Sequence, residues 1–197
     1  SPGVPIDAPI VEKARKMRIP VLGEMEMAAR FIPCDMVALT GTNGKTTTVS
    51  LLGAIFREAG KICYVAGNIG YPLSSAAMLA KKDDMVVVEV SSFQLETTSS
   101  FHPLSAAVLN VTEDHLNRHG TMDVYTGLKK HIFDAQTEKD FAVLNYEDDA
   151  CREMGDELNS RVLYFSRIHE VPEGTFVRDG QIIWRMDGEE KIICRAD

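Results

Sequence analysis

The segment LTGTNGKT at residues 39–46 joins a strand-like run to a helix-like run. Residues 36–39 are short and apolar, as in a buried strand, and apolar residues recur at helical spacing through residues 46–59. The two glycines of the segment allow a tight turn and a close approach to phosphate oxygens, and the N-terminus of the following helix favours negative charge. This order of strand, loop and helix predicts a phosphate-binding loop in an α/β fold.

The side chains of the loop support nucleotide binding. Lys45 adds a mobile cation, and the Thr46 hydroxyl can ligate Mg²⁺. The strict pattern has glycine where this chain has Leu39, so the loop is a variant, and a glycine-rich turn without a ligand is the alternative. Because strand, loop, Gly-Lys-Thr and helix occur together, we expect a nucleotide site. The expected binding residues are Gly41, Thr42, Asn43, Gly44, Lys45, Thr46 and Thr47.

Strand-like and helix-like runs continue to alternate after the loop. Apolar, strand-like runs occupy residues 62–65, 85–90, 106–109 and 141–144. Helix-like runs occupy residues 73–80, 122–135 and 147–158. Such alternation predicts a mainly parallel, doubly wound sheet.

The end of the chain has a different pattern. Strand-like runs lie at residues 175–178, 181–186 and 191–194, and the Asp-Gly dipeptides between them suit tight hairpin turns. We therefore expect a C-terminal antiparallel three-stranded meander attached to the α/β domain.

The start of the chain resembles the end of a separate domain. Asp7 can cap a first helix, and a short strand at residues 19–23 and a short helix at residues 24–31 follow. One strand and two helices cannot enclose a core. We expect residues 1–35 to be a domain tail with a linker, and the next domain to begin at residue 36.

Composition limits the classes of partner. The 197 residues carry a formal net charge of -8 at pH 7 and no basic stripe, which argues against nucleic acid. The chain has no signal peptide and no run of about 18 apolar residues, so we expect no membrane partner. The four cysteines form no Cys-x-x-Cys pair, which favours buried free thiols in a reducing, cytoplasmic location. We also expect a monomer.

Polar clusters follow four of the expected strands, at residues 40–46, 67–70, 89–96 and 110–115. Ligands of an open parallel sheet gather beyond the carboxyl ends of its strands, so we expect these clusters to converge on one edge. Glu89 ends a very apolar strand, where a buried carboxylate needs a partner. Mg²⁺ held jointly with phosphate oxygens would supply that partner, and a cap on the next turn is the alternative.

Two further side chains are open to two interpretations each. His115 could contact a metal or a phosphate, or it could be a loop histidine with a structural hydrogen bond. Lys129 lies within an expected helix near Tyr125 and Ile132, and taken alone it would be a surface lysine whose stem packs on apolar neighbours.

The motifs together resemble those of the Mur ligases, the ATP-dependent amide-forming enzymes of peptidoglycan precursor assembly. Residues 40–47 (TGTNGKTT) are similar to the ATP loop of that family, including the missing leading glycine, and folylpolyglutamate synthases share a similar loop. Residues 89–97 (EVSSFQLET) look like the corresponding segment of the D-glutamate-adding branch, as do residues 67–70 and 110–116. Residues 1–4 look like the tail of the uridine-nucleotide-binding domain of that branch.

The resemblance implies an enzyme, an ATP-dependent acid–D-amino-acid ligase. The γ-phosphoryl group of ATP would pass to the alanyl carboxylate of UDP-N-acetylmuramoyl-L-alanine, and the amine of D-glutamate would attack the acyl phosphate. Such a reaction needs charge neutralisation more than covalent help from the protein. The alternatives are another Mur ligase, a folylpolyglutamate synthase, or a non-catalytic phosphate-loop module that binds nucleotide.

The resemblance also implies roles for single residues. Lys45 would stabilise the β- and γ-phosphates, and Thr46 and Glu89 would hold one Mg²⁺. His115 would help to hold a second Mg²⁺ beside the acyl-phosphate oxygens, so that Lys45 and His115 are both catalytic. The substrate-binding residues would be Asn68, Ser91, Gln94 and His115.

A lysine in a Tyr-x-x-x-Lys-x-x-Ile setting is carbamylated in this family, and Tyr125, Lys129 and Ile132 match that spacing. A neutral lysine captures CO₂ and becomes an anion that can sit beside Mg²⁺, which requires a lysine pKa lowered by burial or by a nearby cation. The resemblance thus makes Lys129 a third catalytic residue and a magnesium ligand, with the adjacent Lys130 as the alternative assignment.

Several parts of the family are missing from this sequence. They are most of the uridine-nucleotide-binding domain, the adenine-contacting segment, the rest of the central sheet and the glutamate-binding domain. The resemblance thus implies that residues 36–197 are a central ATP-binding domain that is incomplete at its C-terminus. We therefore expect the 197-residue chain to be inactive alone.

Overall fold

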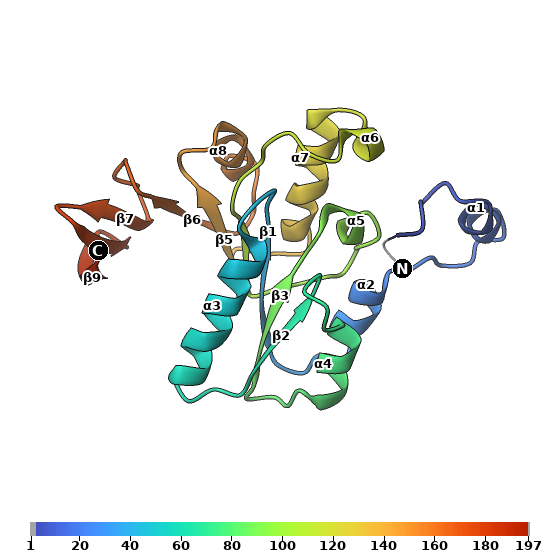
Figure 1. Ribbon diagram of the computed structural model, residues 1–197, viewed down its shortest axis with the longest axis horizontal. Coiled ribbons are helices and arrows are strands. Elements are labelled where there is room, and N and C mark those ends of the chain that lie inside the picture. Colours follow the sequence, from blue (N-terminus) through green and yellow to red (C-terminus); the bar gives the residue numbers. More distant parts are fainter. Residues whose placement is uncertain (1–2, 197) are drawn as a thin grey trace.

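A nine-stranded sheet organises the computed structural model, which describes residues 3–196 (Figure 1). The strands lie in the order β2-β3-β1-β4-β5-β6-β7-β8-β9. Their bounds are β1 Asp35–Thr40, β2 Cys63–Gly67, β3 Met85–Glu89, β4 Ser105–Val108, β5 Phe141–Asn145, β6 Arg161–Ser166, β7 Gly174–Arg178, β8 Gln181–Met186 and β9 Glu189–Arg195. Ser1 and Pro2, which belong to the expected domain tail, and Asp197 lie outside the described residues.

The pairing of the strands confirms the predicted fold class. Parallel pairs join the strands from β2 to β7, and antiparallel pairs join β7 to β8 and β8 to β9. The meander extends the parallel sheet, because β7 pairs with β6. The sequence prediction omits β6, although residues 162–165 carry the β-branched and aromatic side chains typical of a strand.

The two turns of the meander have the conformation that the Asp-Gly dipeptides predict. Asp179 and Gly180 have φ of 51° and 70°, and Asp187 and Gly188 have φ of 53° and 79°. Two consecutive positive φ angles are typical of the tight hairpin turn that matches the twist of the flanking strands. The local sequence therefore accounts for both turns of the meander.

Helices fill the connections between the parallel strands. They are α1 Pro9–Lys16, α2 Glu24–Ala29, α3 Lys45–Glu58, α4 Leu73–Leu79, α5 Ser92–Leu95, α6 Leu116–His119, α7 Met122–Lys130, the 3₁₀ helix η1 His131–Phe133 and α8 Asp149–Gly155. The predicted helix at residues 122–135 is thus divided into α7 and η1, and the short helices α5 and α6 are not predicted. No helix within residues 3–196 is long and apolar enough to cross a membrane.

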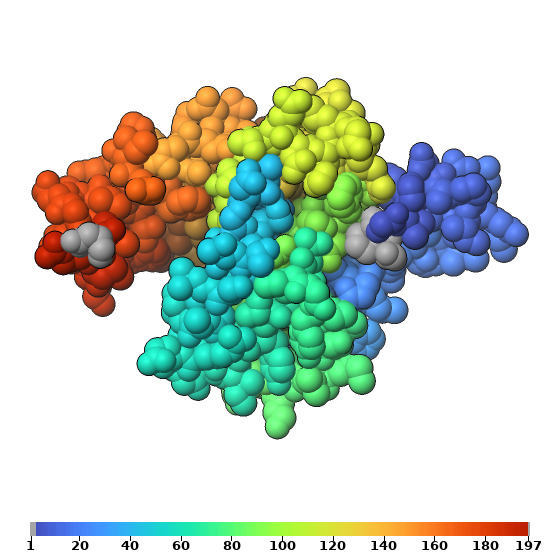
Figure 2. All heavy atoms as spheres, viewed as in Figure 1, coloured from blue at the N-terminus to red at the C-terminus, as the bar shows by residue number. Residues whose placement is uncertain are grey.

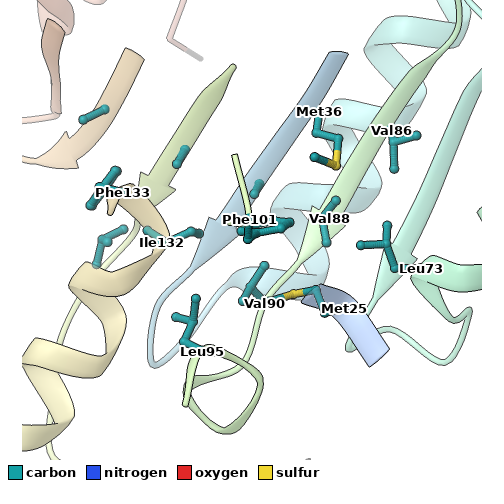
Figure 3. Close-up of a cluster of buried hydrophobic side chains, with 14 of the residues drawn as sticks. Met25, Met36, Leu73, Val86, Val88, Val90, Leu95, Phe101, Ile132 and Phe133 are labelled. Carbon is teal, nitrogen blue, oxygen red and sulfur yellow. The ribbon is translucent and has the colours of Figure 1, made fainter. Parts of the chain in front are cut away.

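The sheet is covered on both faces. Helix α3 packs on one face of β1, β2 and β3, where Leu39, Val49 and Val87 are buried. The larger core lies on the opposite face and includes residues of α2, α4, α7, η1 and α8. Figure 3 labels ten of its side chains, among them Met25, Leu73, Val88, Phe101 and Ile132. Coverage of both faces explains why the sequence of β3 is apolar throughout.

The N-terminal residues differ from the prediction in two respects. Helix α1 begins after Ala8 without a side-chain cap, so the expected cap by Asp7 is wrong. Residues 19–23 form no strand, because none of the described strands pairs with them, and Ile19 instead donates its amide to the Ala14 carbonyl at 2.9 Å. Figure 2 shows the dark blue N-terminal residues as a lobe beside the main body.

Helix α2 is tied to the segment after α5 by one buried carboxylate. Glu26 has no exposed surface and accepts hydrogen bonds from the Ser99 amide at 3.0 Å, the Ser100 hydroxyl at 2.5 Å and Arg30 Nη2 at 2.8 Å. Burial alone would raise the pKa of Glu26, but the bonds from Ser100, Ser99 and Arg30 outweigh it and lower the pKa to about 2. Helix α2, which precedes β1, is therefore anchored to the segment that follows α5.

The cysteines follow the prediction only in part. All four are free, and Cys63 and Cys151 are buried. Cys34 is half-buried and Cys194 is exposed on β9, so the expectation that all four thiols are buried is wrong.

Candidate active site

The carboxyl ends of the central strands lie level with one another, and each leads into a polar loop. Glu89 at the end of β3 lies level with Leu39 of β1 and Gly67 of β2. Thr40 at the end of β1 lies level with Val108 at the end of β4. The four polar clusters predicted from the sequence therefore begin at one edge of the sheet, where ligands of such folds bind.

The loop between β1 and α3 presents main-chain amides to a ligand. Gly44 caps α3 with φ of 82°, a left-handed conformation that favours glycine. The first bond of the helix runs from the Thr48 amide to the Gly44 carbonyl at 3.0 Å, so the amides of residues 44–47 precede the hydrogen-bonded part of α3. At the positive end of the helix dipole, these amides form a cradle for an anion.

Residues that follow β4 hold this loop in shape. The Thr42 amide donates to the Asn110 carbonyl at 3.0 Å, and the Asn43 amide donates to Asn110 Oδ1 at 2.8 Å. Gly41 lies so close to Leu109 that an added Cβ would be 3.0 Å from the Cβ of Leu109. The sequence analysis assigns no role to Asn110, because only the fold brings the loop and the end of β4 together.

Lys45 lies folded over the loop. Its Nζ donates to the carbonyls of Gly41 and Thr42, both at 2.9 Å. These two acceptors are neutral, so a phosphate oxygen can replace them with a gain in electrostatic attraction.

Glu89 is a buried carboxylate beside the loop. It is 1% exposed, and it accepts hydrogen bonds from Thr46 Oγ1 at 2.8 Å and from Asn68 Nδ2 at 3.0 Å. Both donors are neutral, and within residues 3–196 no ion pair involves Glu89. A buried carboxylate without a cation is costly, and a hydroxyl next to a carboxylate provides oxygen ligands of the kind that Mg²⁺ prefers. These residues fit a divalent cation at the phosphate end of the site.

Lys129 is a buried lysine on the other side of the loop. It is 1% exposed, and its Nζ lies 4.4 Å from the centre of the Tyr125 ring. Burial, and next the positive charge of Lys45, lower the pKa of Lys129 to about 7. The expectation of a surface lysine from the residue taken alone is wrong, and the environment suits an amine that reacts in its neutral form. The alternative, Lys130, is paired with Glu157.

His115 lies at the outer end of the site. It caps α6 with φ of 53°, its side chain is 47% exposed, and its Nε2 is 3.5 Å from Asp114 Oδ2. Its ring centre is 5.1 Å from that of Phe93, the second residue of α5. His115 therefore contacts the ring of Phe93, whereas Thr46 and Asn68 each donate a hydrogen bond to Glu89.

Ser91 and Gln94 have a structural role that the sequence analysis did not assign. The Gln94 amide donates to Ser91 Oγ at 3.4 Å, and Gln94 Oε1 accepts from the Ser91 amide at 2.9 Å. This capping box starts α5 and satisfies amides that the helix leaves unpaired. The side-chain amide group of Gln94 has no recorded acceptor within the described residues.

Sequence reasoning missed the aromatic residues between these groups. Phe93 and His119 stack with ring centres 5.1 Å apart, and His119 and Tyr125 stack at 5.4 Å. The spacing of His115 and His119 indicates one face of a helix, but no sequence pattern indicates that α5 and α7 supply the flanking rings.

Comparison with known proteins points to one family. Residues 39–190 match the model of the Mur ligase middle domain. The chain is 52% identical to the UDP-N-acetylmuramoylalanine–D-glutamate ligase of Koribacter versatilis (strain Ellin345), over 100% of this chain and 44% of that protein. It is 48% identical to the ligase of the same name from Thermoanaerobacter sp. (strain X514), over 98% of this chain and 43% of that protein.

A solved structure supports the fold. The MurF ligase from Thermotoga maritima in complex with ADP matches 86% of this chain and 43% of its own, with a TM-score of 0.63 and 20% identity. At this identity the likeness concerns the fold alone. The chain spans less than half the length of the curated relatives named above.

Proposed function

The chain belongs to the Mur ligase family, and we propose that it forms the ATP-handling centre of a ligase that joins D-glutamate to UDP-N-acetylmuramoyl-L-alanine in peptidoglycan precursor synthesis. The names of relatives at 52% and 48% identity favour this branch over other Mur ligases and over folylpolyglutamate synthases. A module that only held nucleotide would not need a buried lysine with a lowered pKa beside its phosphate loop.

The buried carboxylate of Glu89 is the observation that carries this proposal. Its contact with Thr46 Oγ1 at 2.8 Å brings together two oxygen ligands at the end of the phosphate loop. In the proposal Thr46 and Glu89 would hold one Mg²⁺, which would supply positive charge beside the phosphoryl group that is transferred. Lys45 leaves its carbonyl acceptors to bind the β- and γ-phosphates of ATP. The remaining residues of the loop that bind ATP in the proposal are Gly41, Thr42, Asn43, Gly44 and Thr47.

Lys129 and His115 belong to a second Mg²⁺ site in the proposal. The neutral amine of Lys129 attacks CO₂, a nitrogen–carbon bond forms, and a proton leaves to solvent, so that a carbamate anion results. The lowered pKa of Lys129 supports this reaction because it makes the neutral amine available near pH 7. His115 is exposed at the start of α6, which leaves its imidazole able to bind a cation or the substrate.

The muramoyl-alanine substrate approaches from the side of α5 and β2 in the proposal. Asn68 is exposed next to Glu89, and Gln94 retains an unused amide donor for a carboxylate or carbonyl. The proposed substrate-binding residues are Asn68, Ser91, Gln94 and His115.

We further propose that residues 1–35 are the tail and linker of a uridine-nucleotide-binding domain and that residues 36–197 are the central domain. The share of the relatives that the chain covers, 44% and 43%, supports the view that other domains complete the enzyme. The 197-residue chain should then be inactive alone, and the complete enzyme should be a cytoplasmic monomer.

Phosphate release by the full-length protein tests the function. With ATP and UDP-N-acetylmuramoyl-L-alanine present, D-glutamate should support turnover, and L-lysine and diaminopimelate should not. Equal turnover with another amine, or none with D-glutamate, contradicts the proposal. The 197-residue chain under the same conditions should release no phosphate.

A further inference from the structure

His119 is a buried histidine that the proposed mechanism does not use. It is the last residue of α6, and its side chain is 2% exposed. Its Nε2 lies 3.0 Å from Ser92 Oγ, and its Nδ1 lies 3.7 Å from Glu96 Oε1. Both residues belong to the α5 region, so one imidazole joins the end of α6 to the segment that contains the proposed substrate ligands. A neutral ring with its proton on Nδ1, accepting from the Ser92 hydroxyl, fits both contacts.

Aromatic rings cover the two faces of this imidazole. The Phe93 ring is stacked at 5.1 Å with an interplanar angle of 28°, and the Tyr125 ring at 5.4 Å with an angle of 21°. Beyond Phe93 lies His115, with ring centres 5.1 Å apart, and beyond Tyr125 lies Lys129 Nζ at 4.4 Å. The five side chains form a continuous row with His119 at its centre, which we call the ring row.

The ring row also contacts the phosphate loop. The Tyr125 hydroxyl lies 3.3 Å from Thr42 Oγ1, and Thr42 Oγ1 accepts from the Thr112 amide at 3.0 Å. Tyr125 is 1% exposed, so its orientation is set by the side chains that pack on it. The imidazole of His119 thus stacks on a ring that contacts both the loop and Lys129.

We propose that His119 is a positioning residue for the ligase reaction. By filling the space between Phe93 and Tyr125, it fixes His115 and Lys129 relative to the phosphate loop without touching ATP or substrate. The effect of His119 on the ligase reaction rests on the proposed function. The coupling of α5, α6 and α7 to the loop rests on the ring row alone. A histidine that merely packed α6 on α5 would have no effect at Thr42 or Lys129.

An NMR experiment without substrate tests the coupling. His119→Leu keeps an apolar side chain but removes the ring, whereas His119→Phe keeps the ring and removes both polar contacts. His119→Leu should shift the Thr42 amide and the Lys129 side-chain resonances, and His119→Phe should leave them near their original positions. Shifts in His119→Leu that stay confined to Ser92, Phe93 and Tyr125 contradict the proposal. Ser92→Ala, which removes one hydrogen bond and leaves the stack, should behave like His119→Phe.

Kinetics of the full-length protein test the consequence for the reaction. His119→Leu should lower kcat by about 10- to 100-fold, the effect of a small misplacement of reacting groups. Its KM for ATP should stay within about twofold of the original, since the residue contacts no nucleotide, and His119→Phe should restore most of kcat. An unchanged kcat in His119→Leu, or equal losses in the two variants, overturns the proposal. A parent protein without ligase turnover refutes the proposed function, and the NMR result then still decides whether His119 couples the ring row to the loop.

Discussion

Two buried glutamates of this protein, Glu26 in helix α2 and Glu89 at the carboxyl edge of the sheet, have the same burial and opposite surroundings. Glu26 is 0% exposed and is surrounded by an arginine and by the amides and hydroxyls of Ser99 and Ser100. Glu89 is 1% exposed and receives bonds only from the neutral groups of Thr46 and Asn68 in the described part of the chain.

The difference separates a structural carboxylate from a proposed ligand site. The protein itself offsets the cost of burying Glu26, so that helix α2 is fixed to the residues after α5. At Glu89 the described residues supply no cation, and in the proposal Mg²⁺ supplies the missing positive charge. Lys129 is the basic counterpart, since it is buried against a tyrosine ring and forms no ion pair among residues 3–196.

The largest expected effect is on turnover in Glu89→Gln. The substitution keeps shape and removes the anionic magnesium ligand, so turnover of the full-length protein should fall by about 1,000-fold or more. Thermal unfolding should be unchanged or occur at a higher temperature, because a buried charge without a cation is lost. A strongly destabilised Glu89→Gln protein would show that Glu89 is structural in the same sense as Glu26, and the comparison would fail.

The next effect is on stability in Glu26→Gln. This change should lower the free energy of unfolding by roughly 3 kcal/mol, because a carboxylate that accepts several hydrogen bonds is replaced by an amide. The folded-state pKa of about 2 lies below the ordinary glutamate value of 4.5, so the stabilisation by Glu26 is present above about pH 4.5 and is lost as the pH falls toward 2. Urea unfolding of the parent and of Glu26→Gln across this pH range measures the difference in their free energies of unfolding. A difference that does not change with pH contradicts the expected pH dependence.

A smaller effect, of opposite sign, is expected in Lys129→Met. The pKa of Lys129 is lowered to about 7 from 10.5, so the folded protein bears the full cost of the buried charge below about pH 7 and is relieved of it as the pH rises toward 10.5. Lys129→Met should therefore be more stable than the parent by on the order of 2 kcal/mol near pH 6, and by less near pH 9. Urea unfolding in buffers without bicarbonate measures both values, and a variant that is less stable at the lower pH refutes the buried, uncompensated lysine.

The smallest effect is expected in Arg30→Ala. The Arg30 side chain is 44% exposed, so its ion pair with Glu26 should contribute less than about 1 kcal/mol. The amides and hydroxyls of Ser99 and Ser100 should keep Glu26 ionised. A loss as large as that of Glu26→Gln would mean that the arginine, and not the neutral donors, stabilises Glu26.

Features that depend on a few adjacent residues could be predicted from the sequence. The phosphate loop, the strand that ends at Glu89 and the two Asp-Gly turns need only a few adjacent residues, and the structure has them where they were expected. The strand expected at residues 19–23 failed because a strand exists only beside a partner, and no described strand lies there.

The site was less predictable because its contacts join distant segments. The bond from the Asn43 amide to Asn110 Oδ1 spans 67 residues, and the stack of His119 with Phe93 and Tyr125 joins three helices. Ser91 and Gln94 carried the signature of a capping box, and the sequence analysis read them only as ligands. Burial of Lys129 could not be inferred from its helix alone, because it depends on what α7 packs against.

A crystal structure of the full-length protein with Mn²⁺ in place of Mg²⁺ and a non-hydrolysable ATP analogue tests the account most directly. Anomalous scattering should place a manganese ion between the Glu89 carboxylate and the Thr46 hydroxyl, with the hydrogen bond between those groups broken. Nucleotide bound to the loop while Glu89 still accepts from Thr46, with manganese elsewhere, would contradict the claim that this buried carboxylate is kept for a metal.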